Sequence, residues 1–321
     1  MPPRIELHVH LEGTVRPHRL LELARRDDFA LPADTAEGVA RLYEFRDLVE
    51  FIGVWKRTAA CLRTPADYRD VLLDYVAEAA AQGAVYLEAC LCWAPWLADW
   101  AGILAACCDA AEEARERFGV AVGLTPEIYL GCDVAAGEEA ARTAGRFAGR
   151  EVVGFGLAGA EGVRPSAPHE RAVAIAREAG LGYVPHAGEA AGPHSVRQAL
   201  ALGAHRLRHG VRAAEDPGLV AELAARGVVL DVALTSNLRL GVTKSLADHP
   251  LPQLLAAGVR CTVNTDDPAM FNTNLDAEHA AAARLGLTEA QAYAAGLAGA
   301  LCDDATRARL EEAGRQAYGR A

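Results

Sequence analysis

Short strand-like runs alternate with longer helical segments along most of this chain. Each run is rich in apolar and β-branched residues, and the segment after it repeats its apolar residues at helical spacing. Eight such alternations are typical of a (β/α)8 TIM barrel, the α/β fold in which eight parallel strands form an inner ring. The predicted strands span residues 5–10, 85–90, 121–128, 152–157, 182–186, 206–209, 228–233 and 260–264.

Two longer segments predict additions to this barrel. Residues 14–62 are too many for one crossover, and we expect several helices there that cover the top (C-terminal) face of the barrel. From residue 276 onward the pattern predicts a helical C-terminal extension on the outside. An open doubly wound sheet would give the same alternation, but no Gly-x-Gly-x-x-Gly follows the first strand. Since 51% of residues are apolar and no linker interrupts the pattern, residues 1–321 are predicted to form a single barrel domain.

Charge and composition exclude several classes of partner. The net charge is −11, from 32 basic and 43 acidic residues. Nucleic-acid-binding proteins carry a basic face, and an anionic membrane repels an acidic protein, so a small ligand is the expected partner. We expect no signal peptide, because Arg4 and Glu6 interrupt the first apolar run. The most apolar stretch contains Pro95 and Asp99, which excludes a spanning helix there.

The eight cysteines include no Cys-x-x-Cys pair. In a chain of 321 residues this favours reduced, mostly buried thiols in a cytoplasmic protein over a disulfide framework or a thiolate zinc site. The sequence leaves the oligomeric state open, a homo-oligomer included.

Histidines and acidic residues gather at the predicted strand ends. His8 and His10 are two apart on the first strand, so both imidazoles lie on the same side. His186 ends the fifth strand, His209 ends the sixth, and Asp266 follows the eighth. All carboxyl ends of barrel strands meet at one face, where the active sites of this fold lie. Three imidazoles and a carboxylate suit Zn²⁺, which keeps an open position in catalytic sites.

Glu189 follows His186 by three residues and is expected beside this metal. Water bound to Zn²⁺ has a pKa near 7, and a neighbouring carboxyl can carry its proton to the group that becomes basic in the reaction. His209 could hold the attacking hydroxide in line. No second complete ligand set occurs, so we expect one Zn²⁺ per chain.

Six motifs in this order make the chain resemble the adenosine deaminase family of metal-dependent amidohydrolases. They span residues 8 to 268 and are His8-Val9-His10-Leu11-Glu12-Gly13, Gly154-Phe155-Gly156-Leu157-Ala158-Gly159, His186-Ala187-Gly188-Glu189, Arg208-His209-Gly210, Thr235-Ser236-Asn237 and Asn264-Thr265-Asp266-Asp267-Pro268.

The resemblance implies a role for each matching residue. His8, His10, His186 and Asp266 correspond to zinc ligands. Glu189 would protonate purine N1 while hydroxide, oriented by His209, adds to C6, and ammonia would leave to give the 6-oxopurine. Asp267 would bond the purine near N7, and the Gly159 backbone would lie against N3. The implied substrate is adenosine or a similar purine nucleoside.

Departures from the family pattern bear on the substrate. Glu12 stands where many members have Asp, and we expect it to face the sugar; a Glu there favours free adenine. Gly156 replaces an Asp, and we expect it to open space and remove a charge near the same pocket. A longer substituent on the sugar could enter that space, so aminodeoxyfutalosine and adenine remain alternatives to adenosine. Phe45, Phe51 and Trp55 are candidates for an apolar lid over the purine or for ordinary helix packing.

Two other classes are less consistent with the sequence. Ester and phosphoester hydrolases of the superfamily often bridge two metals with a carboxylated lysine, but only Lys56 and Lys244 occur here, and neither ends a predicted strand. A catalytically silent purine-binding protein would not require Glu189 together with four metal ligands.

Overall fold

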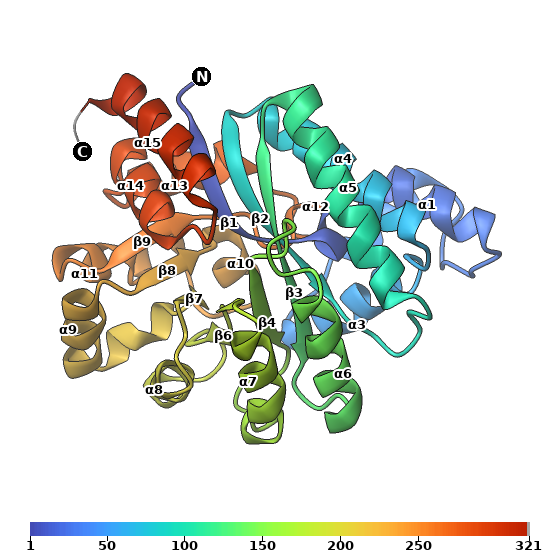
Figure 1. Cartoon of the computed structure of the whole chain (residues 1–321), viewed down its shortest axis with the longest axis horizontal. Helices are drawn as coiled ribbons and strands as arrows, with labels where there is room; N and C mark the ends of the chain where they lie inside the picture. The colour runs from blue at the N-terminus through green and yellow to red at the C-terminus, as the bar shows by residue number, and fades with distance from the viewer. Residues whose placement is uncertain (320–321) are drawn as a thin grey trace.

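Parallel strands follow one another around a ring in the order in which they occur in the chain (Figure 1). The computed structural model describes residues 1–319. Hydrogen bonding divides the ring into β1 to β5 and β6 to β9. The strands are β1 (Arg4–His10), β2 (Ala84–Cys92), β3 (Ala121–Tyr129), β4 (Gly154–Ala158), β5 (Gly182–Tyr183), β6 (His186–Ala187), β7 (Arg206–His209), β8 (Val229–Val232) and β9 (Arg260–Val263).

The eight predicted strands are all present, and one of them is broken. Residues 182–186 form the end-to-end pieces β5 and β6, separated by Val184 and Pro185. Proline has no backbone N–H to give to a neighbouring strand, which accounts for the interruption. The ring continues across the break, because the Pro185 carbonyl accepts a hydrogen bond from Arg208 N.

Backbone hydrogen bonds also join the last strand to the first. His10 N donates to Asp266 O at 2.8 Å, and Asp266 N donates to His8 O at 3.1 Å. The Asn264 side chain accepts from Leu7 N at 2.8 Å. These bonds place the segment after β9 directly against the first His-x-His pair, so the two halves of the metal motif meet at this seam.

Helices surround the ring, as the alternation predicts (Figure 1). Many begin at a side-chain cap; Thr64 and Asp67 form a capping box at the start of α4. The helices are α1 (Pro17–Arg26), α2 (Ala36–Ala40), α3 (Leu48–Ala59), α4 (Pro65–Ala80), α5 (Trp100–Phe118), α6 (Val134–Gly145), α7 (Glu170–Glu178), α8 (Pro193–Ala201), α9 (Pro217–Arg226), α10 (Leu234–Arg239), α11 (Leu251–Ala256), α12 (Pro268–Phe271), α13 (Leu275–Arg284), α14 (Glu289–Gly299) and α15 (Asp304–Tyr318).

Both predicted additions to the barrel are present. Residues 14–62 contain α1, α2 and α3, and α3 lies over the catalytic end of the ring. The C-terminal helices α13 to α15 lie together beside the N-terminus (Figure 1). There α14 packs tightly on β1, since a Cβ on Gly296 would lie 2.7 Å from Ile5 Cβ.

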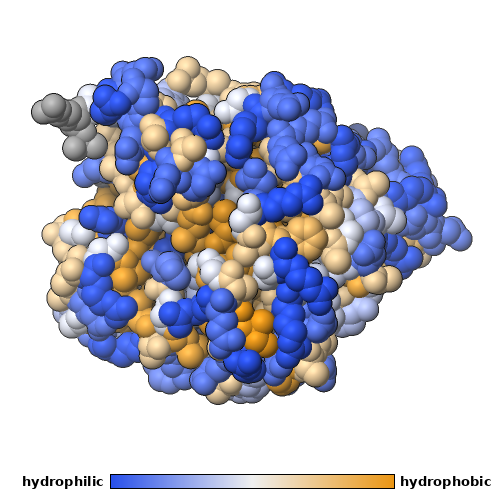
Figure 2. Space-filling model, in the orientation of Figure 1, coloured by the Kyte–Doolittle hydropathy of each residue, from blue (hydrophilic) through white to orange (hydrophobic). Residues whose placement is uncertain are grey.

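The face of the molecule in Figure 2 is largely hydrophilic at its periphery, with hydrophobic residues toward its middle. Within residues 1–319 no helix is long and apolar enough to cross a bilayer. All eight cysteines are free thiols, and seven of them are buried, as the sequence predicted.

Candidate active site

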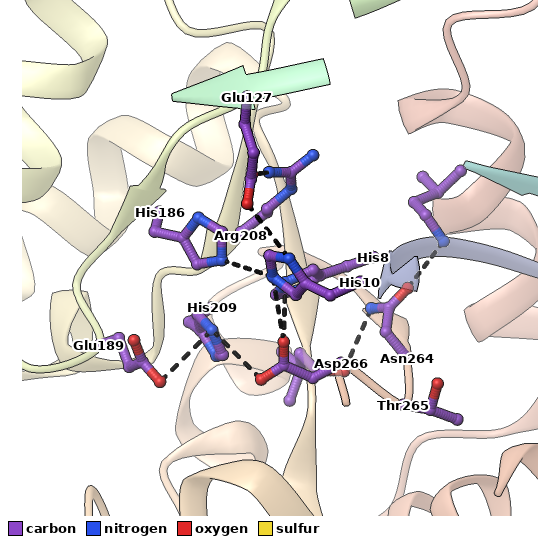
Figure 3. Close-up of polar contacts among 12 residues, drawn as sticks. His8, His10, Glu127, His186, Glu189, Arg208, His209, Asn264, Thr265 and Asp266 are labelled. Carbon is purple, nitrogen blue, oxygen red and sulfur yellow. Dashed lines mark hydrogen bonds and ion pairs between the residues drawn. The ribbon is translucent and has the colours of Figure 1, made fainter. Parts of the chain in front are cut away.

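Three imidazoles and one carboxylate converge at the carboxyl end of the strand ring (Figure 3). His8 and His10 come from β1, His186 begins β6, and Asp266 follows β9. His10 Nε2 lies 3.2 Å from His8 Nε2, 3.1 Å from His186 Nε2 and 3.4 Å from Asp266 Oδ1. His8 Nε2 lies 3.1 Å from the same Asp266 oxygen. The structure therefore brings all four predicted ligand residues together.

The spacing of these atoms tests whether they suit a metal ion. Zinc ligands lie about 2.0–2.1 Å from the metal, so neighbouring ligand atoms of a tetrahedral site are about 3.3–3.4 Å apart. Four of the six separations are 3.1–3.4 Å, and all four ligand atoms lie within 4.8 Å of one another. Three imidazole nitrogens that face one another this closely, with a carboxylate oxygen beside them, form a donor set that could hold a shared metal ion. The donor set fits one Zn²⁺.

Burial and hydrogen bonding keep two of the ligand histidines, His8 and His186, in the form that binds metal. Burial lowers the pKa of His8 to about 3 and holds the pKa of His186 well below its usual value. Both rings are therefore neutral at physiological pH. His186 Nδ1 lies 3.2 Å from the Leu157 carbonyl, which accepts the Nδ1 proton and leaves Nε2 free toward the shared point.

Backbone strain accompanies two site residues. His209 and Asp266 have φ values of +60° and +63°, a region that residues other than glycine rarely occupy. His209 ends β7 and Asp266 lies three residues after β9, and the left-handed turn at each directs its side chain toward the shared cluster. Strain of this kind costs about 1–3 kcal/mol and is found preferentially at functional sites.

Glu189 and His209 lie beside the metal cluster as a second pair. Glu189 Oε1 is 3.4 Å from His209 Nε2. Burial raises the pKa of Glu189 to about 7, although His209 opposes this shift. The Glu189 carboxyl can therefore hold and release a proton near neutral pH.

A chain of hydrogen bonds orients His209. His249 Nε2 donates to Asn237 Oδ1 at 3.1 Å, and Asn237 Nδ2 donates to His209 Nδ1 at 3.2 Å. His209 Nδ1 is thereby an acceptor, so the proton of the neutral ring is on Nε2, toward Glu189. Asn237 was visible as part of a motif, but nothing in the sequence singled out His249.

Glu161 holds the turn that carries Glu189 and was also missed by sequence reasoning. Its carboxylate accepts hydrogen bonds from Gly188 N at 2.6 Å, Glu189 N at 2.9 Å and Ala191 N at 2.9 Å. The only sequence signal was an acidic residue two positions after the Leu-Ala-Gly motif.

Asp267 and Gly159 both line the cavity next to the cluster. Burial and the neighbouring Asp266 hold the pKa of Asp267 well above its usual value, and Asp267 Oδ1 has no hydrogen-bond partner among residues 1–319. Gly159 has φ +105°, which favours glycine. Gly13 is also required, because a Cβ there would lie 2.0 Å from Asp267 Oδ1.

A buried ion pair, Glu127 with Arg208, adjoins the metal cluster and was not predicted (Figure 3). Glu127 Oε1 lies within ion-pair distance of His10 Nδ1, at 3.2 Å, and neither atom has a hydrogen-bond partner within the described chain. Arg208 Nη2 also donates to Thr125 Oγ1 at 2.7 Å. A charged residue in the otherwise apolar strand of residues 121–128 was the signal for Glu127.

The expectation that Gly156 opens space for the substrate is wrong. A Cβ at position 156 would lie 2.6 Å from Arg208 Nη1 and 2.9 Å from Glu127 Cβ. Gly156 and Glu127 are neighbours in the β3–β4 register. The volume that an aspartate side chain would need is filled by the Arg208 guanidinium and Glu127, so Gly156 accommodates an ion pair and not a ligand.

Glu12 is fully buried and is not part of the cavity wall. Its Oε1 accepts hydrogen bonds from Cys92 N at 2.9 Å and Tyr68 OH at 3.3 Å, and burial raises its pKa to about 7. The protein itself therefore supplies polar partners for this carboxyl. A role for Glu12 in substrate binding stays a prediction.

The cavity above these residues has a volume of about 440 Å³, within the usual range for small-molecule sites. Its inner end is polar and contains the cluster, Glu189, His209 and Asp267. Phe51 and Trp55 of α3 line its outer part, whereas Phe45 lies behind them, packed on Phe51 and Phe271. Two of the three aromatic lid candidates therefore face the cavity.

Comparison with known proteins gives a consistent result over the whole chain. A family model described as adenosine deaminase matches residues 3–314. An aminodeoxyfutalosine deaminase from Acidothermus cellulolyticus is 46% identical, over 97% of this chain and 91% of that protein. An adenine deaminase from Streptomyces coelicolor is 38% identical, over 89% of this chain and 85% of that protein.

The solved structures of similar fold include another deaminase and a zinc-bound amidohydrolase. An adenine deaminase from Arthrobacter aurescens has a TM-score of 0.89 and 30% identity, covering 98% of this chain and 99% of that one. An amidohydrolase from Burkholderia ambifaria, solved with bound Zn, has a TM-score of 0.85 and 28% identity, covering 98% and 90%.

Proposed function

Because this chain belongs to the adenosine deaminase family and is a hydrolytic deaminase that binds one zinc ion, we propose that it removes the 6-amino group of a purine nucleoside. Water is consumed, ammonia is released, and the 6-oxopurine remains. The observation that carries this proposal is the convergence of three Nε2 atoms and one carboxylate oxygen beside the Glu189–His209 pair.

His8, His10, His186 and Asp266 are proposed to hold the zinc ion. A bound Zn²⁺ lowers the pKa of water to about 7 and so supplies a nucleophile at neutral pH. Asp266 completes the set as an anion, since the neighbouring His8 and His209 outweigh the effect of burial and hold its pKa well below the usual value. With a zinc ion held there, the single carboxylate of Asp266 would offset only part of its charge, which would favour an electron-rich attacking oxygen.

Glu189 and His209 are proposed to move the proton and direct the water. With a pKa near 7, Glu189 can give its proton to purine N1 as the C6–O bond forms, which leaves C6 tetrahedral. It can then take the one proton that remains on the attacking oxygen and pass it to the amino nitrogen, which leaves as ammonia, and the next water to enter would restore the proton of the carboxyl. The Nε2–H of His209, fixed by Asn237, donates to the attacking oxygen and holds it in line.

Asp267 and Gly159 are proposed to orient the base. The raised pKa keeps the Asp267 carboxyl protonated, so it can donate a hydrogen bond to N7, which accepts only. Gly159 lines the same cavity, and we propose that its backbone lies against N3. Both contacts act on atoms that every 6-aminopurine shares, so they fix orientation without choosing among substrates.

The substrate we propose is a 6-aminopurine nucleoside with an extended group on its sugar, as in aminodeoxyfutalosine. The relative at 46% identity is named for that compound, and a cavity of about 440 Å³ with an aromatic outer part suits a ligand longer than the base. Free adenine is the second candidate, because relatives at 38% and 30% identity are named adenine deaminases.

A substrate panel tests this choice. We expect kcat/KM for aminodeoxyfutalosine to exceed that for adenine by more than tenfold, which corresponds to about 1.4 kcal/mol of transition-state preference. The assay is loss of the 6-aminopurine absorbance with zinc-replete protein, and Glu189→Gln serves as the inactive control. A tenfold preference for adenine would overturn the nucleoside proposal.

A further inference from the structure

Three buried side chains form a row that leads from His209 away from the cavity to the start of a helix. His209, Asn237 and His249 are each at most 3% exposed. His249 follows the 3-10 helix η5 (Leu246–Asp248), and its Nδ1 accepts a hydrogen bond from Leu251 N at 3.1 Å. Leu251 begins α11, where a backbone N–H has no carbonyl partner within the helix. The row therefore starts at a backbone donor, and such a group cannot act as an acceptor.

This backbone donor fixes the direction of every hydrogen bond in the row. Because His249 Nδ1 accepts, the ring proton of His249 is on Nε2, and Nε2 donates to Asn237 Oδ1 at 3.1 Å. Burial lowers the pKa of His249 to about 4, so its ring carries a single proton at neutral pH. With its oxygen used in this way, the Asn237 side chain has only its amino group to offer to His209 Nδ1, which lies 3.2 Å away. His209 Nδ1 is therefore an acceptor, and the ring proton of His209 is on Nε2.

His209 Nε2 faces the reacting groups (Figure 3). It lies 3.4 Å from Glu189 Oε1 and 3.7 Å from Asp266 Oδ2, two carboxyl oxygens that can accept its proton. With Nε2 protonated and the Nδ1 lone pair held by Asn237, His209 has no free lone pair for a proton of the attacking water. His209 can therefore donate a hydrogen bond to that water, and the transfer of protons is left to Glu189.

We propose that His249 is a positioning residue that selects, through Asn237, the Nε2-protonated form of His209. Resting on the deamination proposed above, this role extends the machinery of the reaction to a residue that does not line the cavity. A wrong histidine tautomer is costly. In serine proteases, replacing the aspartate that orients the catalytic histidine by asparagine lowers kcat about 10⁴-fold although the geometry is retained. His249 acts through a second side chain, so we expect a smaller effect on kcat.

Two substitutions of His249 separate positioning from packing. His249→Gln offers an amide N–H to Asn237 but gives up the ring nitrogen that accepts from Leu251 N. His249→Asn keeps an acceptor near Leu251 N but is too short to reach Asn237. With aminodeoxyfutalosine and adenine as probes, we expect kcat to stay within about threefold in His249→Gln and to fall about tenfold or more in His249→Asn, with KM changed less than about twofold in both.

The urea midpoints of the two variants should show the opposite order. His249→Asn is expected to be the more stable variant, because it retains the bond to Leu251 N at the start of α11. If the rates followed the urea midpoints, so that His249→Asn were also the more active variant, His249 would be a structural residue only and the proposal would be wrong.

Histidine ¹⁵N NMR determines the tautomer without any substrate, and the His209 signals are assigned by their loss in His209→Gln. In the zinc-loaded protein we expect the His209 proton on Nε2. In His249→Asn we expect a fraction with the proton on Nδ1, because the Asn237 amide is then free to turn. Asn237→Asp supplies the reference for the reversed form, since an aspartate has only acceptor oxygens and requires a proton on His209 Nδ1. A proton on Nδ1 in the unaltered protein, or no change in His249→Asn, would overturn the proposal.

His205→Asn is the matched control for these measurements. His205 Nδ1 also accepts from a backbone N–H, that of Tyr183 at 3.0 Å, but among the described residues His205 has no hydrogen bond to His209 or Asn237. This variant should leave both kcat and the His209 signals unchanged. If the unaltered protein deaminates neither 6-aminopurine, the proposed function is wrong, and the NMR spectra still decide whether His249 sets the tautomer of His209.

Discussion

Two buried arginines on the same strand differ in how completely the polar atoms around them are hydrogen-bonded. Arg206 and Arg208 are two residues apart on β7, and both are fully buried and paired with carboxylates. Arg206 donates to Asp231 at 2.7 Å, to Leu7 O at 2.9 Å and to Gly299 O at 3.2 Å, and it pairs with Glu88. Each side-chain polar atom of this lower cluster, defined as Arg206, Glu88 and Asp231, has a partner.

The upper cluster, defined as Arg208 and Glu127, is incompletely satisfied. Arg208 Nε and Glu127 Oε1 lack hydrogen bonds within the described residues, as do His10 Nδ1 and Asp267 Oδ1 close by. Buried polar groups are almost always paired, and unpaired ones gather where function has a use for them. We therefore expect the fully hydrogen-bonded lower cluster to contribute mainly to stability, and the incompletely hydrogen-bonded upper cluster to contribute to the active site.

The largest expected effect concerns chemistry at the upper layer. Glu189→Gln should lower kcat by at least 10²–10⁴-fold, because an amide cannot carry the proton. Its zinc content and its urea midpoint should stay close to those of the unaltered enzyme, since the amide keeps the shape of the carboxyl. Metal analysis and steady-state rates check this; near-normal turnover of the zinc-loaded variant would remove Glu189 from the mechanism.

Breaking the lower cluster should cost stability instead. Arg206→Met leaves Glu88 and Asp231 buried without their cation, which typically costs about 3–5 kcal/mol. Urea unfolding gives the value. Adding Glu88→Gln and Asp231→Asn should recover part of the loss, because no buried charge is then unpaired. A cost below about 1 kcal/mol for the single variant would show that the cluster does not act as a unit.

The carboxylate partners of the two arginines, Glu127 and Glu88, allow a direct comparison of the upper and lower clusters. Glu127→Gln should weaken zinc binding about 10–100-fold, the usual cost of losing a carboxylate partner of a metal-bound histidine. Glu88→Gln should leave zinc affinity within about twofold and lower the unfolding free energy by about 1.5–3 kcal/mol. Chelator competition on the apo-protein and urea unfolding separate the two; equal zinc effects in both variants would contradict the distinction.

The packing around the upper cluster can be tested at Gly156. Gly156→Ala should destabilise the protein by about 1–2 kcal/mol, because the new methyl would overlap Arg208 and Glu127. Gly53→Ala is the control: it lies in α3, where an added methyl would have nothing within 4 Å, so alanine there should stabilise by about 0.5–1 kcal/mol. A neutral or stabilising Gly156→Ala would restore the idea of open space at that position.

The smallest predicted effect is a pH dependence. Because the pKa of Glu189 is raised to about 7, its proton is present at pH 6 and lost as pH rises through 7. If the protonated form is required, kcat/KM should fall about twofold between pH 6 and pH 7, about fivefold between pH 7 and pH 8, and about tenfold per unit above that. A rate that rises through this range would assign the required form to the carboxylate instead.

Features with a local period or a short motif could be read from the sequence. The eight strand runs appear because burial between helices requires continuous apolar segments, and glycines mark many helix ends. The residues of the metal cluster were equally accessible, since His8 and His10 are adjacent in strand geometry and the other partners end their own strands. Strand order alone then predicts that these ends meet.

Contacts that depend on side-chain volume were decided by the tertiary structure. The absence of a side chain at Gly156 suggested open space for a substrate. Only the fold shows that the side chain of Arg208, 52 positions later in the sequence, fills that space. Glu12 appeared to face the sugar, but Cys92 N and Tyr68 OH reach it first.

The net charge is known from the sequence, whereas the positions of the charged side chains are known only from the fold. A net charge of −11 indicated a small ligand and not a nucleic acid or an anionic membrane, whereas the fold places Lys56 and Arg164 among the residues that line the cavity. Periodicity and motif order are properties of the chain and need no coordinates. Which buried charge pairs with which, and which cations remain unpaired, depends on distances of a few ångströms between residues far apart in sequence, and only packing determines those.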